Sequence, residues 1–305
     1  MKSLTATASL TFTGERFTPE NRGAIWYEHW HRYCVVAPLA RGRTVLDAAC
    51  GEGYGSALLA REATKVIGID IGAEAIAHAQ ARYVAPNLSY VLASVTDIPL
   101  ADGTVDLIVS FETIEHLAAQ RRMLAEFRRV LAPAGVMIIS SPNRPVYNEG
   151  GEGENAFHVR ELDRAELKAL LDPGFPRQAW HAQRVVANSA LWAEGHASNG
   201  PASFDVLTAD GPERRDTPAG PMYFVVVCAA DGVALPPLPA LSLFDDDARS
   251  LWREFARVAQ RERQLVWDEI DARTIAEERL AELTDALNSL ASERQKAEVA
   301  RVRFE

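Results

Sequence analysis

Apolar and polar residues follow two alternating patterns along the first 230 residues. Short β-branched or apolar runs, typical of buried strands, are separated by longer segments whose apolar positions recur every three or four residues, as in amphipathic helices. Strands that alternate with helices in this way predict right-handed βαβ units and a mostly parallel sheet. The expected strands are 44–48, 65–71, 88–93, 105–110 and 136–140, and the expected helices are 23–40, 54–61, 73–83, 117–131 and 163–171.

The pattern becomes less regular after the fifth expected strand. Residues 142–160 are rich in Gly, Asn and Glu. A connection of that length is more often a functional loop than a simple link between two elements. Two later strands are expected at 179–191 and 222–230, on either side of a polar, Gly/Pro-rich stretch at 193–221. These two strands predict an antiparallel pair at one edge of the sheet.

The two ends of the chain differ from this α/β pattern. Residues 1–22 are polar and are expected to form a mostly extended arm, and residues 231–240 form a Pro-rich linker. Residues 241–305 contain neither Gly nor Pro, and their leucines recur by three and four, which predicts one long helix. The heptad register slips near its middle, so a two-stranded coiled coil competes with a hairpin or with packing back on the domain. We therefore predict an α/β domain at 1–230 and a helix at 241–305 that forms a homodimer or binds a partner in a biosynthetic complex.

A glycine-rich turn follows the first expected strand. The segment VLDAACGEGYG, residues 45–55, runs from an apolar strand into Gly51, Gly53 and Gly55. Glycines allow positive φ and a close approach of the backbone to a ligand, and ligands of such sheets bind beyond the carboxyl ends of the strands. Asp47 is awkward beside a pyrophosphate but suits a cationic amino group, and the spacing departs from G-x-G-x-x-G. The turn therefore favours S-adenosylmethionine over a nicotinamide dinucleotide, with a tight turn that binds no ligand as the remaining interpretation.

Two more acidic residues stand at the ends of expected strands. Asp70 ends the second strand, VIGIDI, where its carboxylate could accept hydrogen bonds from two ribose hydroxyls. Asp97 follows the third strand and could accept a hydrogen bond from the amine of adenine. The alternative for Asp97 is a turn-forming role just before Pro99.

Composition narrows the classes of protein that fit this pattern. Hydrophobic residues make up 48% and charged residues 24% of the 305 residues, so a collagen-like or wholly disordered chain is excluded. We find no apolar run long enough to span a bilayer and no signal-peptide core, and three cysteines do not make a disulfide framework. We therefore expect a cytoplasmic protein. The net charge of −10 argues against a nucleic-acid partner held by phosphate contacts.

Four segments, in this order, resemble the motifs of class I S-adenosylmethionine-dependent methyltransferases. They are VLDAACGEGYG, VIGIDI, DIPLADGTVDLIVSFETIEHL and RRVLAPAGVMIISSPN, and the resemblance covers about residues 10–230. Within that family TGERFTPE, EHWHRY, FETIEH and NAFHVREL look like a bacterial subgroup that methylates sugars and glycans. The resemblance implies a Rossmann-like α/β fold with a seven-stranded, mostly parallel sheet of order 3-2-1-4-5-7-6 and an antiparallel last strand.

The resemblance also implies roles for individual residues around the cofactor. Asp47, Gly51, Gly53 and Gly55 would hold the methionine moiety, Asp70 and Ile71 the ribose end, and Thr96 and Asp97 the adenine. Ser110, Phe111 and Glu112 would lie beside the sulfonium. The arm and the first helix would cap the cofactor with Arg16, Phe17, His29 and Tyr33; Arg16 either pairs with the cofactor carboxylate or is simply solvated.

A cluster of carboxylates and imidazoles follows the fourth strand. Glu112 and Glu115 share a face if they lie on a helical turn, His116 is adjacent, and His158 lies across the long loop. These four side chains could bind a divalent cation such as Mg²⁺, which would lower the pKa of a bound hydroxyl. A similar Glu-x-x-Glu-His run with a distant histidine binds a metal in small-RNA 2′-O-methyltransferases. The alternative is that the glutamates order the loop and His116 is a metal-free base.

The chemistry of methyl transfer fits this cluster. Alignment of the acceptor with the C–S bond supplies much of the rate, and a hydroxyl acceptor needs a base to take its proton as the new bond forms. His116 is suited to that role, with Glu112 as the alternate base. We therefore expect an O-methyltransferase that acts on a sugar or glycan intermediate. N- or C-methylation of another small molecule, and a scaffold protein with a vestigial methyltransferase domain, are the alternatives.

Overall fold

The computed structural model describes residues 23–147, 155–186, 204–208, 211–215, 217, 220–245 and 249–302. The expected N-terminal arm and most of the stretch 193–221 therefore lie outside the described residues. The chain divides into two compact units, Met1–Asp245 and Asp246–Glu305. Within the described residues no helix combines the length and the apolar character that crossing a membrane requires.

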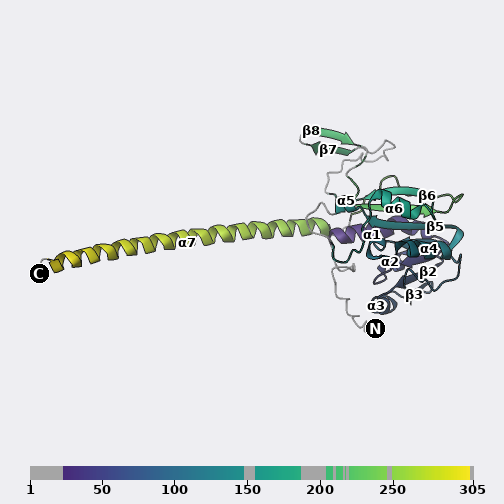
Figure 1. The fold of residues 1–305 in the computed structure, drawn as a ribbon, viewed down its shortest axis with the longest axis horizontal. Helices are drawn as coiled ribbons and strands as arrows, with labels where there is room; N and C mark the ends of the chain where they lie inside the picture. Colours follow the sequence, from purple (N-terminus) through teal and green to yellow (C-terminus); the bar gives the residue numbers. More distant parts are fainter. Residues whose placement is uncertain are drawn as a thin grey trace. The chain divides into compact units, whose positions relative to one another are not determined.

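A seven-stranded sheet forms the centre of the first unit (Figure 1). Its order is β3-β2-β1-β4-β5-β9-β6, and β9 runs antiparallel to both of its neighbours while the other pairs are parallel. Because β9 is the seventh strand of this sheet along the chain, the expected order 3-2-1-4-5-7-6 is confirmed. The strands are β1 Thr44–Ala48, β2 Lys65–Asp70, β3 Leu88–Leu92, β4 Val105–Ser110, β5 Leu131–Pro142, β6 Arg177–Gln183 and β9 Tyr223–Ala229.

Helices cover both faces of this sheet. Successive side chains of a strand point to opposite faces, and β1 shows the division: Leu46 packs in the large core cluster with α4 and α6, whereas Asp47 contacts α1 and α2. An Asp163 capping box begins α6. The helices of this unit are α1 Ala24–Val36, α2 Tyr54–Leu59, α3 Ala73–Arg82, α4 Gln120–Val130, α5 Arg144–Tyr147 and α6 Arg164–Leu171, with 3-10 turns at Ala37–Ala40 and Ile114–His116.

The structure differs from the sequence-based expectation in the later strands of the sheet and in the stretch between them. The fifth strand begins at Leu131, where the expectation still had helix, and the sixth strand ends at Gln183 instead of continuing to residue 191. A separate two-stranded hairpin, β7 Phe204–Thr208 and β8 Gly211–Arg215, lies within the stretch that we expected to be an irregular loop. Asp and Gly, the residue types at 210 and 211, are common in turns, and the sequence analysis did not use them as a sign of a hairpin.

The segment before the long helix packs against α1, so the expected boundary at residue 241 is wrong. The Phe244 ring contacts Trp26, Tyr27 and His31 with centroid distances of 5.2–5.4 Å. Two hydrogen bonds accompany it, from Tyr27 to Asp245 (3.1 Å) and between His31 and Ser242 (2.9 Å). Residues 241–245, here called the strap, therefore belong to the first unit.

The second unit is a single long helix, as expected. It is α7, Ser250–Val302, and it begins nine residues later than predicted. Its apolar side chains, including Leu280, Leu283, Leu287 and Leu290, are exposed. A single helix cannot cover its own apolar stripe, so this unit by itself leaves the stripe open to water.

Candidate functional site

The glycine-rich turn connects β1 to α2, and each glycine has its own structural reason. Gly51 and Gly53 have positive φ values of 55° and 96°, a conformation that residues with a Cβ rarely adopt. At Gly55 a Cβ would lie 2.1 Å from the Tyr33 ring. The first two glycines therefore shape the turn, as expected for a ligand-binding loop, whereas Gly55 makes room for the ring of α1.

Asp47 lies beneath this turn and is fully buried. Its carboxylate accepts hydrogen bonds from the Tyr33 hydroxyl (2.9 Å) and the Ser56 hydroxyl (2.5 Å). Burial raises the pKa of Asp47 to about 6, although both hydrogen bonds act to lower it. In this arrangement Asp47 connects α1 and α2 to the glycine turn, and its expected contact with a cofactor amino group stays a prediction.

Asp70 stands at the tip of β2, as expected. Its two carboxylate oxygens accept hydrogen bonds from the backbone N–H groups of Gly51 (2.9 Å) and Gly72 (2.7 Å). The residue thereby links the glycine turn to the end of the next strand, and each oxygen still has a second lone pair for a ligand hydroxyl. Ile71 beside it is 78% exposed, which leaves an apolar side chain open at this edge.

The third and fourth strands bring further expected residues to the same edge of the sheet. Thr96 and Asp97 lie in a turn closed by the Asp97 N–H and the Ser94 carbonyl (3.0 Å), and Asp97 is exposed. Phe111, after β4, packs edge-on against Tyr33 with ring centroids 5.1 Å apart. Ser110 is buried, and its hydroxyl has no hydrogen-bond partner within the part of the chain that the structure describes.

The expected capping residues are only partly visible. Arg16 and Phe17 lie outside the described residues. His29 is on α1, where burial and the neighbouring Arg32 hold its pKa well below the ordinary value. Tyr33 is 5% exposed and contacts Asp47, Phe111 and the glycine turn.

Glu112 does not join the histidines; it pairs with Arg32 of α1. Its Oε1 lies 3.0 Å from Arg32 Nη1 and accepts a hydrogen bond from the Ser140 hydroxyl (2.6 Å). Glu112 also has a positive φ of 47°, a strained conformation for a non-glycine residue, and its N–H donates to the same Ser140 hydroxyl (2.9 Å). The expected metal ligand is thus committed to an ion pair on the other side of the strand end.

Arg32 is the centre of a polar network that the sequence analysis missed. Its Nε donates to Gln183 (2.5 Å), and its guanidinium lies 4.4 Å above the centre of the Tyr223 ring. The Tyr223 hydroxyl donates to Glu28 (3.1 Å), and burial raises the pKa of Glu28 to about 7. Only the spacing of Glu28 and Arg32, four apart on one expected helix, hinted that these charges share a face.

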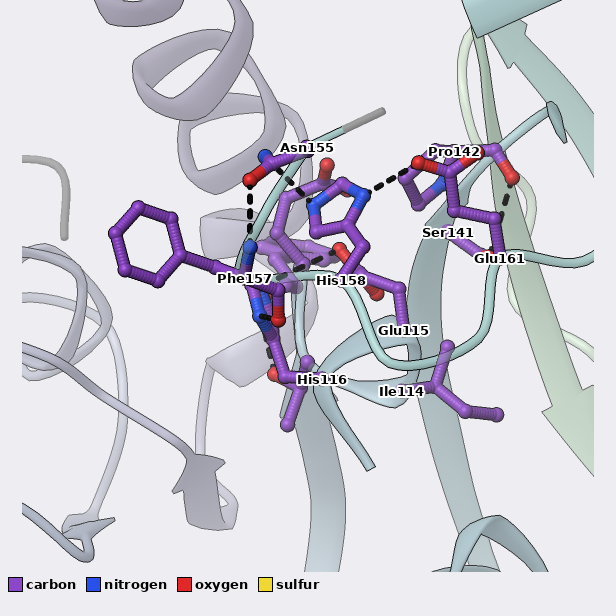
Figure 2. A network of polar contacts seen from close by, with 12 residues as sticks. Ile114, Glu115, His116, Ser141, Pro142, Asn155, Phe157, His158 and Glu161 are labelled. Carbon is purple, nitrogen blue, oxygen red and sulfur yellow. Dashed lines mark hydrogen bonds and ion pairs between the residues drawn. The ribbon is translucent and has the colours of Figure 1, made fainter. Parts of the chain in front are cut away.

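The other three members of the expected cluster come together in Figure 2. Ligand atoms of Glu115, His116 and His158 all lie within 4.8 Å of one another, and the two imidazole rings meet edge to face at 4.9 Å. The His116 Nδ1 donates to the Phe157 carbonyl (3.0 Å). Because a carbonyl can only accept, this bond places the proton of the neutral ring on Nδ1 and makes Nε2 the basic nitrogen.

His158 is held between two partners. Its Nδ1 lies 2.6 Å from Glu161 Oε1, and its Nε2 lies 3.1 Å from the Asn155 amide nitrogen. An amide nitrogen only donates and a carboxylate accepts, so Nδ1 carries the proton and Nε2 receives the bond from Asn155. Both ring nitrogens are therefore already engaged, and His158 fixes the loop that covers His116.

Glu115 is fully buried beneath His116. Its carboxylate oxygens have no hydrogen-bond partner in the described parts of the chain, although Oε1 lies 4.0 Å from His116 Nε2. Burial and the nearby Glu112 raise the pKa of Glu115 well above its ordinary value. With Glu112 elsewhere, the remaining donors are one carboxylate and two imidazoles, whereas Mg²⁺ prefers oxygen ligands, so the set does not fit Mg²⁺.

Comparisons with known proteins agree with this geometry. A family described as a methyltransferase domain matches residues 46–139. A protein of Mycobacterium tuberculosis (strain CDC 1551 / Oshkosh), named as a probable S-adenosylmethionine-dependent methyltransferase, is 41% identical over 177 residues, which cover 57% of this chain and 64% of that protein. A similarly named protein of Mycolicibacterium smegmatis is 41% identical over 171 residues, covering 54% and 65%. The phthiotriol/phenolphthiotriol dimycocerosates methyltransferase 1 of Mycobacterium ulcerans is 29% identical over 167 residues, covering 53% and 60%.

A solved structure supports the fold. The complex between the Haloferax volcanii Trm112 methyltransferase activator and a protein described as a methyltransferase matches with a TM-score of 0.50 at 20% identity, over 67% of this chain and 89% of that one. The chain spans just under two thirds of the length of its Mycobacterium tuberculosis and Mycolicibacterium smegmatis relatives. These matches place residues 46–139 in a methyltransferase domain family, and the sheet order and the glycine turn agree with the class I S-adenosylmethionine-dependent type.

Proposed function

We propose that this protein transfers the methyl group of S-adenosylmethionine to a hydroxyl of a sugar or glycan intermediate, with His116 as the general base. The observation that carries the proposal is the hydrogen bond from His116 Nδ1 to the Phe157 carbonyl, which orients the ring and leaves Nε2 as the proton acceptor. His116 follows the end of β4, next to Phe111 and the cofactor edge of the sheet.

The residues present fit the cofactor. A turn built on two positive-φ glycines allows close approach of a ligand, and Asp70 at the strand tip has lone pairs available for ribose hydroxyls. When bound, S-adenosylmethionine supplies a methyl group on a sulfonium, which is an excellent leaving group. We place Asp70 at the ribose, Thr96 and Asp97 near the adenine, and Phe111 near the sulfonium, and we assign Asp47 and Tyr33 to the support of the glycine turn.

His116 would take the acceptor proton at Nε2 as the acceptor oxygen receives the methyl group, and the imidazole would leave the reaction protonated. Glu112, the alternate base, is engaged by Arg32 and Ser140 through the same carboxylate oxygen. That engagement favours His116 over Glu112.

The test is turnover of His116→Ala on a panel of sugars and nucleotide sugars with labelled cofactor. We expect a loss on the order of 10²–10⁴-fold, with the affinity for S-adenosylhomocysteine unchanged. His181→Ala, which removes a partly buried histidine of β6, is the matched control. Near-normal turnover of His116→Ala would contradict its role as base, and labelling of no sugar by the wild type would contradict the acceptor class.

We infer that this transfer does not need Mg²⁺, because Glu112 is committed to Arg32 and both nitrogens of His158 are engaged. Turnover is therefore expected to survive exhaustive treatment with EDTA. Loss of turnover that Zn²⁺ restores would instead show that Glu115, His116 and His158 hold a metal, since imidazole-rich sites suit Zn²⁺.

A different small-molecule acceptor is the second candidate. The Mycobacterium ulcerans relative is named for phthiotriol dimycocerosates and not for a sugar. A hydroxylated lipid or an N- or C-nucleophile in the same panel would be labelled in that case. A scaffold with a vestigial domain is distinguished by calorimetry, since it need not bind S-adenosylhomocysteine.

A further inference from the structure

Arg32 has a donor that the described part of the chain does not use. Its side chain is 1% exposed, and its contacts are Gln183 at Nε, Glu112 at Nη1 and the face of the Tyr223 ring. Nη2 is buried and has neither a hydrogen bond nor an ion pair with any described residue. Buried guanidinium nitrogens are normally satisfied by an acceptor, so a ligand oxygen is the natural partner.

The position of Arg32 in the fold indicates which ligand this is. The neighbouring Tyr33 faces Asp47 and the glycine turn, on the β1 and β2 side where the cofactor residues gather. Arg32 instead contacts the end of β4, β6 and β9, which lie toward the other side of the sheet. The unused nitrogen therefore lies on the side of the sheet that is left for the methyl acceptor.

Aromatic contacts connect Arg32 to the proposed base. The Tyr223 ring, beneath the guanidinium, lies 5.9 Å from Tyr147, and Tyr147 lies 5.5 Å from His158, which packs on His116 at 4.9 Å. One continuous row of side chains thus runs from Arg32 to His116. Arg32 and the proposed base therefore stand at the two ends of one set of contacting side chains.

The charges around Arg32 favour a neutral, hydroxyl-rich ligand over an anion. Glu112 and Glu28 both lie close to the guanidinium and would repel a carboxylate or phosphate. A hydroxyl can accept from Nη2 and donate to a neighbouring carboxylate at the same time. A tyrosine ring also offers an apolar face for the C–H groups of a sugar.

We propose that Arg32, Tyr223 and Glu28 form the subsite for the methyl acceptor, in which Arg32 Nη2 donates a hydrogen bond to a hydroxyl oxygen of a neutral sugar. This inference rests on the proposed function, because it assumes a hydroxyl-rich acceptor. It assigns a ligand contact to Glu28 and Arg32, which stand in the segment EHWHRY, and to Tyr223, and none of these three was among the expected site residues.

The test measures the binding of two sugars to the full chain saturated with S-adenosylhomocysteine. Ligand-observed NMR gives the affinity for methyl α-D-glucopyranoside and, in a separate experiment, for D-glucuronate. The wild type is expected to bind the neutral sugar more tightly than the acid. Arg32→Lys keeps the positive charge but loses the planar guanidinium group. This substitution is expected to lower the affinity for the neutral sugar at least tenfold and to leave the affinity for S-adenosylhomocysteine within twofold of the wild-type value. Arg41→Lys, at an exposed ion pair with Glu62, is the matched control.

Each outcome has one meaning. No binding of either sugar to the wild type overturns the proposed acceptor class and this subsite with it. Normal sugar binding by Arg32→Lys overturns the subsite alone, and a parallel loss of S-adenosylhomocysteine affinity assigns Arg32 to the cofactor carboxylate instead. Tighter binding of D-glucuronate overturns the choice of a neutral ligand. If Arg32→Lys does not fold, as judged by circular dichroism, Glu28→Gln and Tyr223→Phe decide the question by the same measurements.

Discussion

Removal of the Tyr33 hydroxyl tests the claim that a buried, partly protonated Asp47 supports the glycine turn. Tyr33→Phe keeps the ring that packs on Gly55 and Phe111 and deletes only the donor to Asp47. A hydrogen bond to an ionised group contributes about 1.5–3 kcal/mol, and a neutral one about 0.5–1.5 kcal/mol. The cost of the substitution should therefore depend on whether Asp47 is charged.

The pH dependence follows from the pKa of Asp47. Burial raises that pKa to about 6 in the folded state, whereas an aspartate in an unfolded chain titrates near about 3.9. The folded state therefore binds more protons than the unfolded state between these values. Because of this group, the free energy of unfolding rises as the pH falls from about 6 toward about 4. Above about pH 7, the cost of burying the charged carboxylate lowers the free energy of unfolding by its full value of about 3 kcal/mol.

We expect Tyr33→Phe to lower the free energy of unfolding by about 2 kcal/mol at pH 8 and by about 1 kcal/mol at pH 5, because Asp47 is neutral in the folded protein at the lower pH. Urea titration followed by tryptophan fluorescence measures both values. Tyr90→Phe is the matched control, since the buried Tyr90 hydroxyl donates to the uncharged Gly53 carbonyl (3.0 Å). Its cost should be about 1 kcal/mol at both pH values. An equal cost of Tyr33→Phe at pH 8 and pH 5 would refute the reasoning.

Three further predictions concern the cofactor site and the tail. Asp70→Ala is expected to weaken the binding of S-adenosylhomocysteine by about 1.5–3 kcal/mol, as measured by titration calorimetry. An unchanged affinity would show that Asp70 does not bind the ribose. Truncation after Asp245 should keep the strap and the thermal stability of the first unit. Truncation after Ala230 should lower the free energy of unfolding by about 2 kcal/mol, because the ring contacts of Phe244 and the hydrogen bonds of its neighbours are lost. Equal melting temperatures of the two truncated proteins would show that the strap contributes nothing to stability. The full chain is expected to self-associate through α7, because its exposed leucines cost about 25 cal/mol per Å² in water, and light scattering that gives a monomer at micromolar concentration would rule this out.

The alternation of strands and helices was enough to predict the sheet, because its strands are short apolar runs with clear turn signals. The hairpin β7–β8 was missed because it lies in a polar stretch and Pro212 argues against a strand. The boundary at residue 241 was wrong for a different reason: Phe244 fits a helical pattern, but its place is decided by Trp26 and Tyr27, more than 200 positions earlier.

The sequence predicted which residues lie near the site, but it did not predict which side chains pair with one another. Local motifs placed Asp70 and the glycines at the strand ends, where the structure has them. The sequence placed Glu112 with His116 because the two are close along the chain, but the positive φ of Glu112 turns it toward Arg32. That choice depends on the docking of α1, which no local pattern records.

The contacts of α1 also determine when the site can be completed during synthesis. The partners of α1 come much later in the chain: Gln183, the partner of Arg32, lies 151 positions after it, and Asp245, the partner of Tyr27, lies 218 positions after it. Contacts of such long sequence separation form late in folding. A nascent chain can therefore assemble the glycine turn before α1 has all its partners, and α1 gains its full set of contacts only after residue 245 has been made.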